Sequence, residues 1–262
     1  MKQGVPLGDR MKDYESFQTS QKLYSQLPVI ARMDGRAFHS FCRPFAKPFD
    51  EGLIFAMDST CIDLVKEFNA DLGYVQSDEI TLVFLPKDLN SQLPFGGREF
   101  KLQSVLASFT SVSFMKHIKN HEIVLSRNWL DGRLPHFDAR VFNVPNIDEA
   151  ANAVLWRILD AEKNSIQMLG QAHFSHKQLH GLKGGQIKTK LEEEQGVVWG
   201  ELPSRRKSGT LVKRVVVSKV LQGVTYHRSN VVTMDVPRKL VNMSNKTDVL
   251  FSGADPIYKQ EE

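Results

Sequence analysis

Three acidic residues in the first third of the chain have the types and surroundings that metal-dependent chemistry needs. Asp34 ends a short apolar run, and Asp78 and Glu79 lie between two further apolar runs. Carboxylates beside a backbone carbonyl form a hard-oxygen site that suits Mg²⁺. Two such ions can activate an attacking hydroxyl and neutralise a leaving pyrophosphate. From spacing alone, the alternative is that Asp34-Gly35 and Ser77-Asp78 are simply turns.

A candidate phosphate site follows Asp34. The run from Asp34 to His39 leaves a strand through a glycine, so its successive backbone N–H groups could hold a triphosphate. Its members are Asp34, Gly35, Arg36, Ala37, Phe38 and His39. Lys47, Arg98 and Lys101 could add charge to the phosphates, although any single lysine or arginine is more often an ordinary solvated cation.

Two polar clusters lie in the second half. Trp156, Arg157, Asp160 and Asn164 recur at three- and four-residue spacing, so they share one helix face that suggests a contact with a partner. The alternative is an Arg157–Asp160 surface pair with Trp156 packed in the core. The second cluster is basic and suits polyanion phosphates, and its members are Arg205, Arg206, Lys207, Lys213 and Arg214.

A sheet is needed to bring the acidic residues together. Apolar runs predict strands over 28–33, on both sides of the 77–79 turn, and over 137–145. Apolar residues at helical spacing predict helices within 51–70 and 98–117. The order is β-α-β-β-α-β, so we expect an α+β, ferredoxin-like sheet with helices on one face. Strand one then lies beside strand three, and Asp34 faces the hairpin turn.

The remainder predicts a C-terminal helical and β-hairpin extension. A long helix is expected over about 148–172 with Asp148 as its N-cap, and a charged helix over 182–196. The segment 205–217 is basic and then apolar around a glycine, which predicts a projecting hairpin. We divide the chain into 1–145 and 146–262, expected to form one structural unit.

Composition sets the class of protein. The 262 residues carry a net charge of +4 with a pI near 9.0, which permits a polyanionic partner without requiring one. Two cysteines, outside any Cys-x-x-Cys pair, indicate neither a disulfide framework nor a cysteine zinc site. The N-terminus lacks the apolar core of a signal peptide, and no apolar run reaches the ~18 residues that span a bilayer. We therefore expect a soluble, intracellular protein without a membrane partner.

Six segments together resemble the histidine-tRNA guanylyltransferase family, also called the 3′–5′ RNA polymerases. Each segment is weak evidence alone, but they occur in the family's order and cover most of residues 28–215. They are ARMDGRAFHSF (31–41), AKPFD (46–50), GYVQSDEITLVF (73–84), KLQSVLASFTS (101–111), FDARVF (137–142) and LWRILDAEKNSI (155–166).

The resemblance implies a polymerase-palm-like catalytic domain, tRNA as partner, and ATP and GTP as substrates. It implies that Asp34, Asp78 and the Gly35 carbonyl bind two Mg²⁺ ions and that Glu79 supports the site. The 34–39 backbone would hold the triphosphate, with Ser77, Lys47, Arg98 and Lys101 as nucleotide contacts. Arg157, Asp160, Asn164 and the basic cluster would contact RNA. A cytoplasmic homotetramer is the expected form.

One segment departs from the eukaryotic members of the family. They carry His-Ile-Asn-Asn in the long helix, where this chain has Glu162-Lys163-Asn164-Ser165. The pattern resembles the bacterial and phage guanylyltransferase-like proteins, which tend toward template-directed repair of tRNA 5′ ends. Two other functions stay open: a palm-type nucleotide cyclase, and a tRNA-binding protein without catalytic activity.

Overall fold

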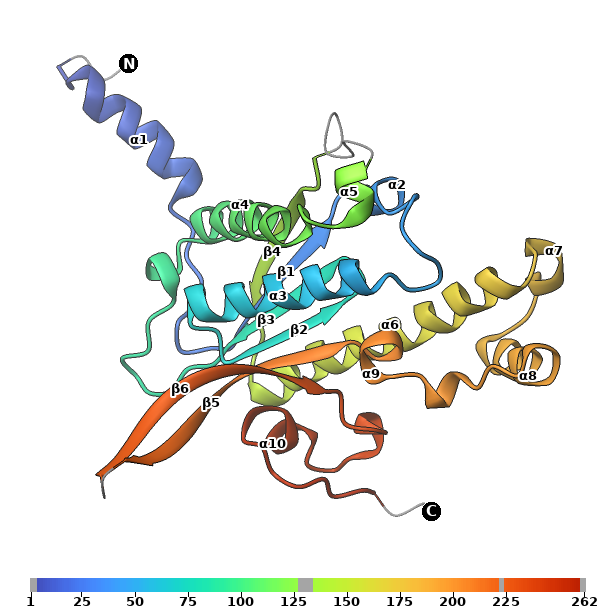
Figure 1. The fold of residues 1–262 in the computed structure, drawn as a ribbon. Helices are drawn as coiled ribbons and strands as arrows, with labels where there is room; N and C mark the ends of the chain where they lie inside the picture. Colours follow the sequence, from blue (N-terminus) through green and yellow to red (C-terminus); the bar gives the residue numbers. More distant parts are fainter. Residues whose placement is uncertain (1–3, 127–133, 222–223, 260–262) are drawn as a thin grey trace.

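The computed structural model of the protein describes residues 4–126, 134–221 and 224–259. Within these ranges one antiparallel sheet has the strand order β4-β1-β3-β2-β5-β6 (Figure 1). Its strands are β1 (Val29–Gly35), β2 (Leu72–Gln76), β3 (Glu79–Phe84), β4 (Phe137–Asn143), β5 (Thr210–Leu221) and β6 (Val224–Asp235). The first four have the predicted β-α-β-β-α-β order, with β1 beside β3.

Helices cover both faces of the sheet, which corrects the prediction of helices on one face. α3 (Glu51–Phe68) and α4 (Glu99–Ile118) pack on one side (Figure 1). α6 (Ile147–His173) and α10 (Lys246–Phe251) pack on the other. In β1, Val29 and Met33 belong to the first core and Ile30 to the second. A strand that is apolar on successive residues is buried on both sides.

The other helices are short connections, apart from α1 and α8. α1 projects from the body of the protein (Figure 1). None of the described helices is long and apolar enough to cross a membrane. These elements are α1 (Leu7–Thr19), α2 (Phe38–Phe41), η1 (Pro94–Gly97), α5 (Glu122–Ser126), α7 (His176–Leu179), α8 (Gly184–Gln195), η2 (Trp199–Glu201), α9 (Ser204–Lys207) and η3 (Leu240–Asn242).

The long helix α6 begins earlier than predicted. Its N-cap is Asn146, whose side-chain oxygen accepts a hydrogen bond of 2.9 Å from the Glu149 N–H. Asp148 lies in the first turn instead, where its carboxylate accepts a 2.6 Å bond from the Thr247 hydroxyl. An extended residue with a short polar side chain is the usual helix start, and Asn146 meets that requirement better than Asp148.

The hairpin predicted within 205–217 is wrong in its position. Residues 204–207 form α9, and the hairpin is β5–β6, whose joining residues 222–223 lie outside the described ranges. Gly209 marks the entry to β5 rather than a hairpin turn. It has φ +86°, and a Cβ there would lie 2.5 Å from the Val75 carbonyl oxygen. The chain therefore passes close against β2 and pairs with it, which extends the sheet.

Candidate active site

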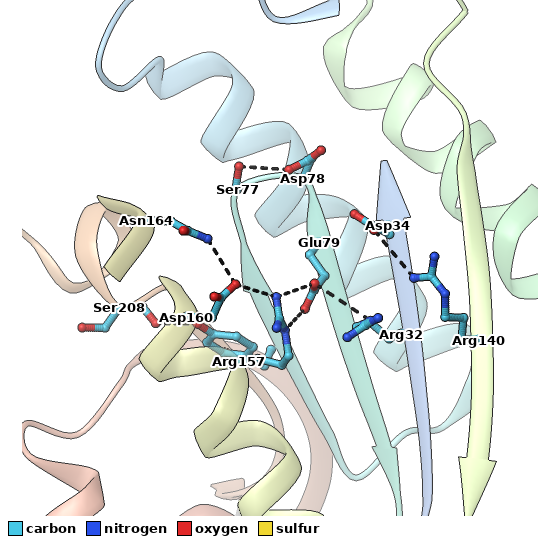
Figure 2. Close-up of polar contacts among 11 residues, drawn as sticks. Arg32, Asp34, Ser77, Asp78, Glu79, Arg140, Arg157, Asp160, Asn164 and Ser208 are labelled. Carbon is cyan, nitrogen blue, oxygen red and sulfur yellow. Dashed lines mark hydrogen bonds and ion pairs between the residues drawn. The ribbon is translucent and has the colours of Figure 1, made fainter. Parts of the chain in front are cut away.

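Asp34 and Asp78 meet where β1 ends beside the β2–β3 turn. Asp34 is the register partner of Glu79 (Figure 2). The Gly35 N–H donates a 3.0 Å hydrogen bond to the Asp78 carbonyl oxygen. The Ser77 hydroxyl donates to Asp78 Oδ1 at 3.0 Å. The predicted convergence of the end of β1 with the hairpin turn is therefore confirmed, although the two aspartates are 44 positions apart in the sequence.

The electrostatics of this pair favour a cation. Burial raises the pKa of Asp78, and the Asp34 carboxylate raises it further, while the Ser77 hydroxyl acts in the opposite direction. Two carboxylates that repel each other are stabilised by a positive ion between them. Among the described residues, no three His, Cys, Asp or Glu side chains form a complete metal cage. Mg²⁺ suits such a partial set, because it keeps several waters and substrate phosphates as ligands.

Glu79 has a different position from the two aspartates. Its Oε1 accepts from Arg157 Nε at 2.6 Å and its Oε2 from Arg157 Nη2 at 2.8 Å (Figure 2). Arg32 Nε lies 4.0 Å from the same Oε2. Burial raises the pKa of Glu79, although the Arg157 guanidinium opposes it. Glu79 therefore ties α6 to the β2–β3 hairpin through Arg157, and its predicted catalytic role stays a prediction.

The long-helix cluster contains the Arg157–Asp160 pair of the second sequence interpretation, but that interpretation is wrong about Trp156. Arg157 is only 9% exposed and also bonds Asp160 at 3.0 Å, so its predicted contact with RNA is not favoured by its burial and stays a prediction. Asn164 donates to the same Asp160 carboxylate at 3.1 Å, and both residues face the cavity described below. Trp156 is 55% exposed rather than packed in the core.

The run after Asp34 is shaped by one aromatic ring. A Cβ on Gly35 would lie 2.4 Å from the ring of Phe38, which packs in the core. Two of the predicted backbone donors are already used, because the Gly35 and Arg36 N–H groups bond the Asp78 and His136 carbonyls. The N–H groups of Ala37, Phe38 and His39 remain at the start of α2, where helices leave their first donors without internal acceptors.

A cavity of about 530 Å³ opens beside the two aspartates. That volume is typical of small-molecule sites. Lys47 faces this cavity from a loop, and α9 supplies three further positively charged side chains. The cavity therefore has carboxylates on one side and positive charge on another. The lining includes Asp34, His39, Lys47, Ser77, Asp78, Asp160, Asn164, Arg205, Arg206 and Lys207.

The Lys47 loop is held by the start of α3. Asp50 is the N-cap of that helix and accepts bonds from the Leu53 N–H at 2.9 Å and the Ala46 N–H at 3.1 Å. His121 Nε2 lies 3.0 Å from the same carboxylate. Although burial would raise the pKa of Asp50, these bonds outweigh burial and lower it. The loop that carries Lys47 is therefore anchored at its base.

The α9 cations belong to the cavity, which sequence reasoning missed. Arg206 bonds Glu51 Oε1 at 2.8 and 2.5 Å, and Arg205 lies 3.6 Å from Glu51 Oε2 and 3.7 Å from Asp58. Lys207 bonds the Gly200 carbonyl. Their basic sequence suggested an extended RNA contact, and only the turn before β5 shows that they face Asp34 and Asp78.

The other two residues of the basic cluster are structural. Lys213 is 9% exposed on β5, and burial lowers its pKa. Arg214 donates to the Val65 carbonyl and to Ser229 Oγ, both at 3.1 Å, and so ties β5 to α3 and β6. The burial of Lys213 and the bonds of Arg214 do not favour the predicted contact with RNA phosphates, which stays a prediction.

Arg98 and Lys101 lie away from the cavity. The backbone of Arg98 forms a bridge with Lys22, in the segment that leads into β1 at Val29. Asp34 is at the other end of that strand, roughly 16 Å away at about 3.3 Å per residue. Within one chain neither side chain lines this cavity, so their contact with a nucleotide stays a prediction.

Comparison with known proteins identifies several relatives. Residues 8–145 match the tRNAHis guanylyltransferase family. An uncharacterised protein of Acanthamoeba polyphaga mimivirus is 33% identical over 81% of this chain and 78% of its own length. The tRNA(His) guanylyltransferase of Saccharomyces cerevisiae is 26% identical over 76% of this chain and 87% of its own.

Solved structures give the same result. A bacterial tRNA(His) guanylyltransferase-like protein in complex with ATP superposes with a TM-score of 0.71 and 35% identity, over 86% of this chain and 91% of that one. The bacterial guanylyltransferase-like structure in complex with GTP gives a TM-score of 0.71 and 33% identity, over 87% and 90%.

Proposed function

This chain belongs to the tRNAHis guanylyltransferase family, and from that premise we propose that it is a nucleotidyltransferase that extends the 5′ end of a tRNA in the 3′–5′ direction. One observation carries the proposal: Asp34 and Asp78 converge at a cavity that five lysine and arginine side chains also line. Carboxylates and cations together suit a nucleoside triphosphate with its metal ions. The bacterial relatives' complexes with ATP and GTP support nucleotides as substrates.

The proposed reaction has two phosphoryl-transfer steps. A 5′-monophosphate oxygen of the tRNA forms a bond to the α-phosphorus of ATP, and pyrophosphate leaves. The 3′-hydroxyl of the incoming nucleotide then forms a bond to the activated 5′ phosphorus, and AMP leaves. Lys47, Arg205 and Arg206 would hold the triphosphate, and the free N–H groups of Ala37–His39 would orient it.

Mg²⁺ fits the proposed site on the chemistry of its donors. Asp34, Asp78 and the Gly35 carbonyl would hold two ions, which would lower the charge on the transferring phosphoryl groups. The repulsion between the two carboxylates supports this assignment. We also propose that 1–145 and 146–262 act as one unit, because β5 pairs with β2. The homotetramer and the polymerase-palm comparison stay predictions.

The test of the proposed function also tests how the base is chosen. We expect the protein to transfer label from α-labelled GTP to a tRNA that lacks its first 5′ nucleotide. The nucleotide that it adds should be the one that pairs with the base opposite the gap. Triphosphate and metal contacts carry no base information. Glu162, in the position of the eukaryotic histidine run, accepts a 3.0 Å bond from Ser208 and is occupied structurally. Pairing with the opposite strand is therefore the remaining source of selection.

The measurement places each of the four bases opposite the gap and offers each nucleotide. We expect the pairing nucleotide to be preferred at least about tenfold, which corresponds to ~1.4 kcal/mol. Equal use of GTP against all four bases would show a guanosine-specific enzyme instead. A cyclic product from GTP alone would indicate the cyclase, and tRNA binding without transfer would indicate a silent binding protein.

Lys47 and Arg206 should determine nucleotide use. We expect Lys47→Ala and Arg206→Ala each to raise the GTP concentration for half-maximal rate about tenfold, because each loses a charge-assisted hydrogen bond to phosphate. Affinity for tRNA should stay unchanged. Lys66→Ala, an exposed lysine at the far end of α3, is the matched control. If tRNA affinity falls while GTP dependence stays constant, these cations are RNA contacts.

A further inference from the structure

The proposed function needs a surface for tRNA, and most of the predicted RNA contacts do not supply one. Arg157 and Lys213 are buried, Arg214 ties β5 to its neighbours, and the α9 cations line the nucleotide cavity. The tRNA 5′ end must nevertheless reach Asp34 and Asp78. A surface that adjoins the aspartates from outside the cavity is therefore required.

Such a surface lies on β1 and β4, beside α6. Register pairs Arg32 with Arg140, and Ile30 with Phe142, so these side chains point to the same side of the sheet as Asp34. Ile30 lies under α6, but the helix does not cover the outer positions. We call this surface the β1–β4 face, and its members are Arg32, Arg36, Arg140, Phe142 and Trp156.

The β1–β4 face combines accessible rings with accessible cations. Trp156 is 55% exposed and Phe142 is 40% exposed, and the side chain of Arg140 is 49% exposed. The indole of Trp156 has the Arg157 guanidinium 4.6 Å and the Arg32 guanidinium 5.4 Å from its centroid. Both arginines are held by Glu79, so the ring is fixed in place while remaining open to solvent.

The face is continuous with the catalytic aspartates. Arg140 Nη1 lies 3.7 Å from Asp34 Oδ2 (Figure 2). Arg140 Nη2 lies 3.2 Å from Asp138 Oδ1. Arg36 follows Asp34 by two residues, is exposed, and has its Nη1 3.3 Å from His136. A strand of RNA along this face would therefore present its end directly to Asp34.

We propose that the β1–β4 face binds the acceptor end of the tRNA, with Arg36 and Arg140 on its phosphates and Trp156 stacked against an unpaired base. Exposed aromatic rings next to cations are what single-stranded nucleic acid requires. A second copy of the chain is the alternative occupant, and phosphates suit Arg36 and Arg140 better, because a protein partner would have to place a carboxylate opposite each of them. This inference rests on the proposed function and adds the site of its RNA substrate.

The test measures binding of a fluorescent 5′-truncated tRNA by anisotropy over a range of salt concentrations. We expect Arg140→Gln and Trp156→Ala each to weaken tRNA binding about tenfold. Arg140→Gln should also lower the slope of log affinity against log salt by about one, whereas Trp156→Ala should leave that slope unchanged. Trp156→Phe keeps a ring and should retain most of the affinity. Arg228→Gln, an exposed arginine on the opposite edge strand, is the matched control.

Two accompanying measurements separate the outcomes. GTP affinity should be unchanged in the Trp156 variants and in Arg228→Gln, since neither residue lines the cavity. Arg140→Gln is judged on tRNA affinity and salt slope, because Arg140 Nη1 lies 3.7 Å from Asp34 Oδ2. Unchanged tRNA affinity and salt slope in Arg140→Gln and Trp156→Ala would overturn the inference, as would a loss of oligomers without a loss of tRNA binding. If the variants bind tRNA as tightly as the wild type and all of these proteins transfer label, the inference about the β1–β4 face fails while the proposed function stands. If the wild type itself neither binds tRNA nor transfers label, the proposed function fails.

Discussion

Replacing Asp34 or Asp78 by alanine is expected to reduce nucleotide addition about a thousandfold or more while the protein stays folded. Each carboxylate would hold Mg²⁺ against the transferring phosphate, and such stabilisation is worth several kcal/mol, at ~1.4 kcal/mol for each factor of ten in rate. The fold should not suffer, because burial and the neighbouring Asp34 raise the pKa of Asp78 and show that its ionised form is poorly accommodated without a cation.

The measurement combines single-turnover label transfer with thermal melting. Asp88→Asn, an exposed aspartate in the loop beyond β3, is the matched control and should transfer label at the normal rate. Mg²⁺ should raise the melting temperature of the wild type and should do so much less in Asp34→Ala, because binding to the folded state stabilises it. Near-normal transfer in either alanine variant, with unchanged melting, would remove the metal assignment.

The sequence predicted the part of the site that depends on backbone topology. Once the order β-α-β-β-α-β is recognised, β1 must lie beside β3, and Asp34 comes to the β2–β3 turn whatever the side chains around it. The structure has Asp34 opposite Glu79 in that register. The sequence also predicted that the chain leaves the strand at Gly35. The spacing of residues could not predict the close contact between Gly35 and the ring of Phe38.

Side-chain roles were not predictable in the same way, because charge in a sequence does not reveal burial. Arg157 and Lys213 look like surface cations, yet one is paired with Glu79 and the other is covered in the sheet. Lys101 belongs to a family-like segment, but α4 begins at the end of the sheet opposite Asp34. Arg140 lies in a strand of alternating polar and apolar residues and has no distinctive sequence signal. Only the pairing of β4 with β1, in which Arg140 is opposite Arg32, brings it close to Asp34.

The hairpin was misplaced for a related reason. Gly209 looks like a turn between a basic and an apolar segment, whereas it allows the backbone to pass within contact of Val75. Pairing of β5 with β2 is a contact across more than 130 residues of sequence, as in Val75 with Thr210. A local pattern carries no information about such a partner.

Replacing Arg157 by alanine is expected to lower the free energy of unfolding by about 3–5 kcal/mol, the largest stability effect of any single change considered. The reason is that Glu79, whose side chain is 8% exposed, would keep its charge without its partner. Arg157→Lys should recover only part of the loss, since an ammonium cannot reproduce the two-bond fork to both carboxylate oxygens. Urea unfolding at neutral pH measures the difference.

A double-mutant cycle with Glu79→Gln shows whether the pair is structural or catalytic. If Glu79 acts through Arg157, Arg157→Ala should cost much less in the Glu79→Gln background, because no buried charge is left behind. Glu79→Gln alone should slow label transfer far less than Asp78→Ala and should leave the Mg²⁺ concentration for half-maximal rate unchanged, because both oxygens already accept from Arg157. A large rise in that Mg²⁺ concentration would make Glu79 a metal ligand. A small stability loss in Arg157→Ala, accompanied by weakened tRNA binding, would instead restore Arg157 as an RNA contact.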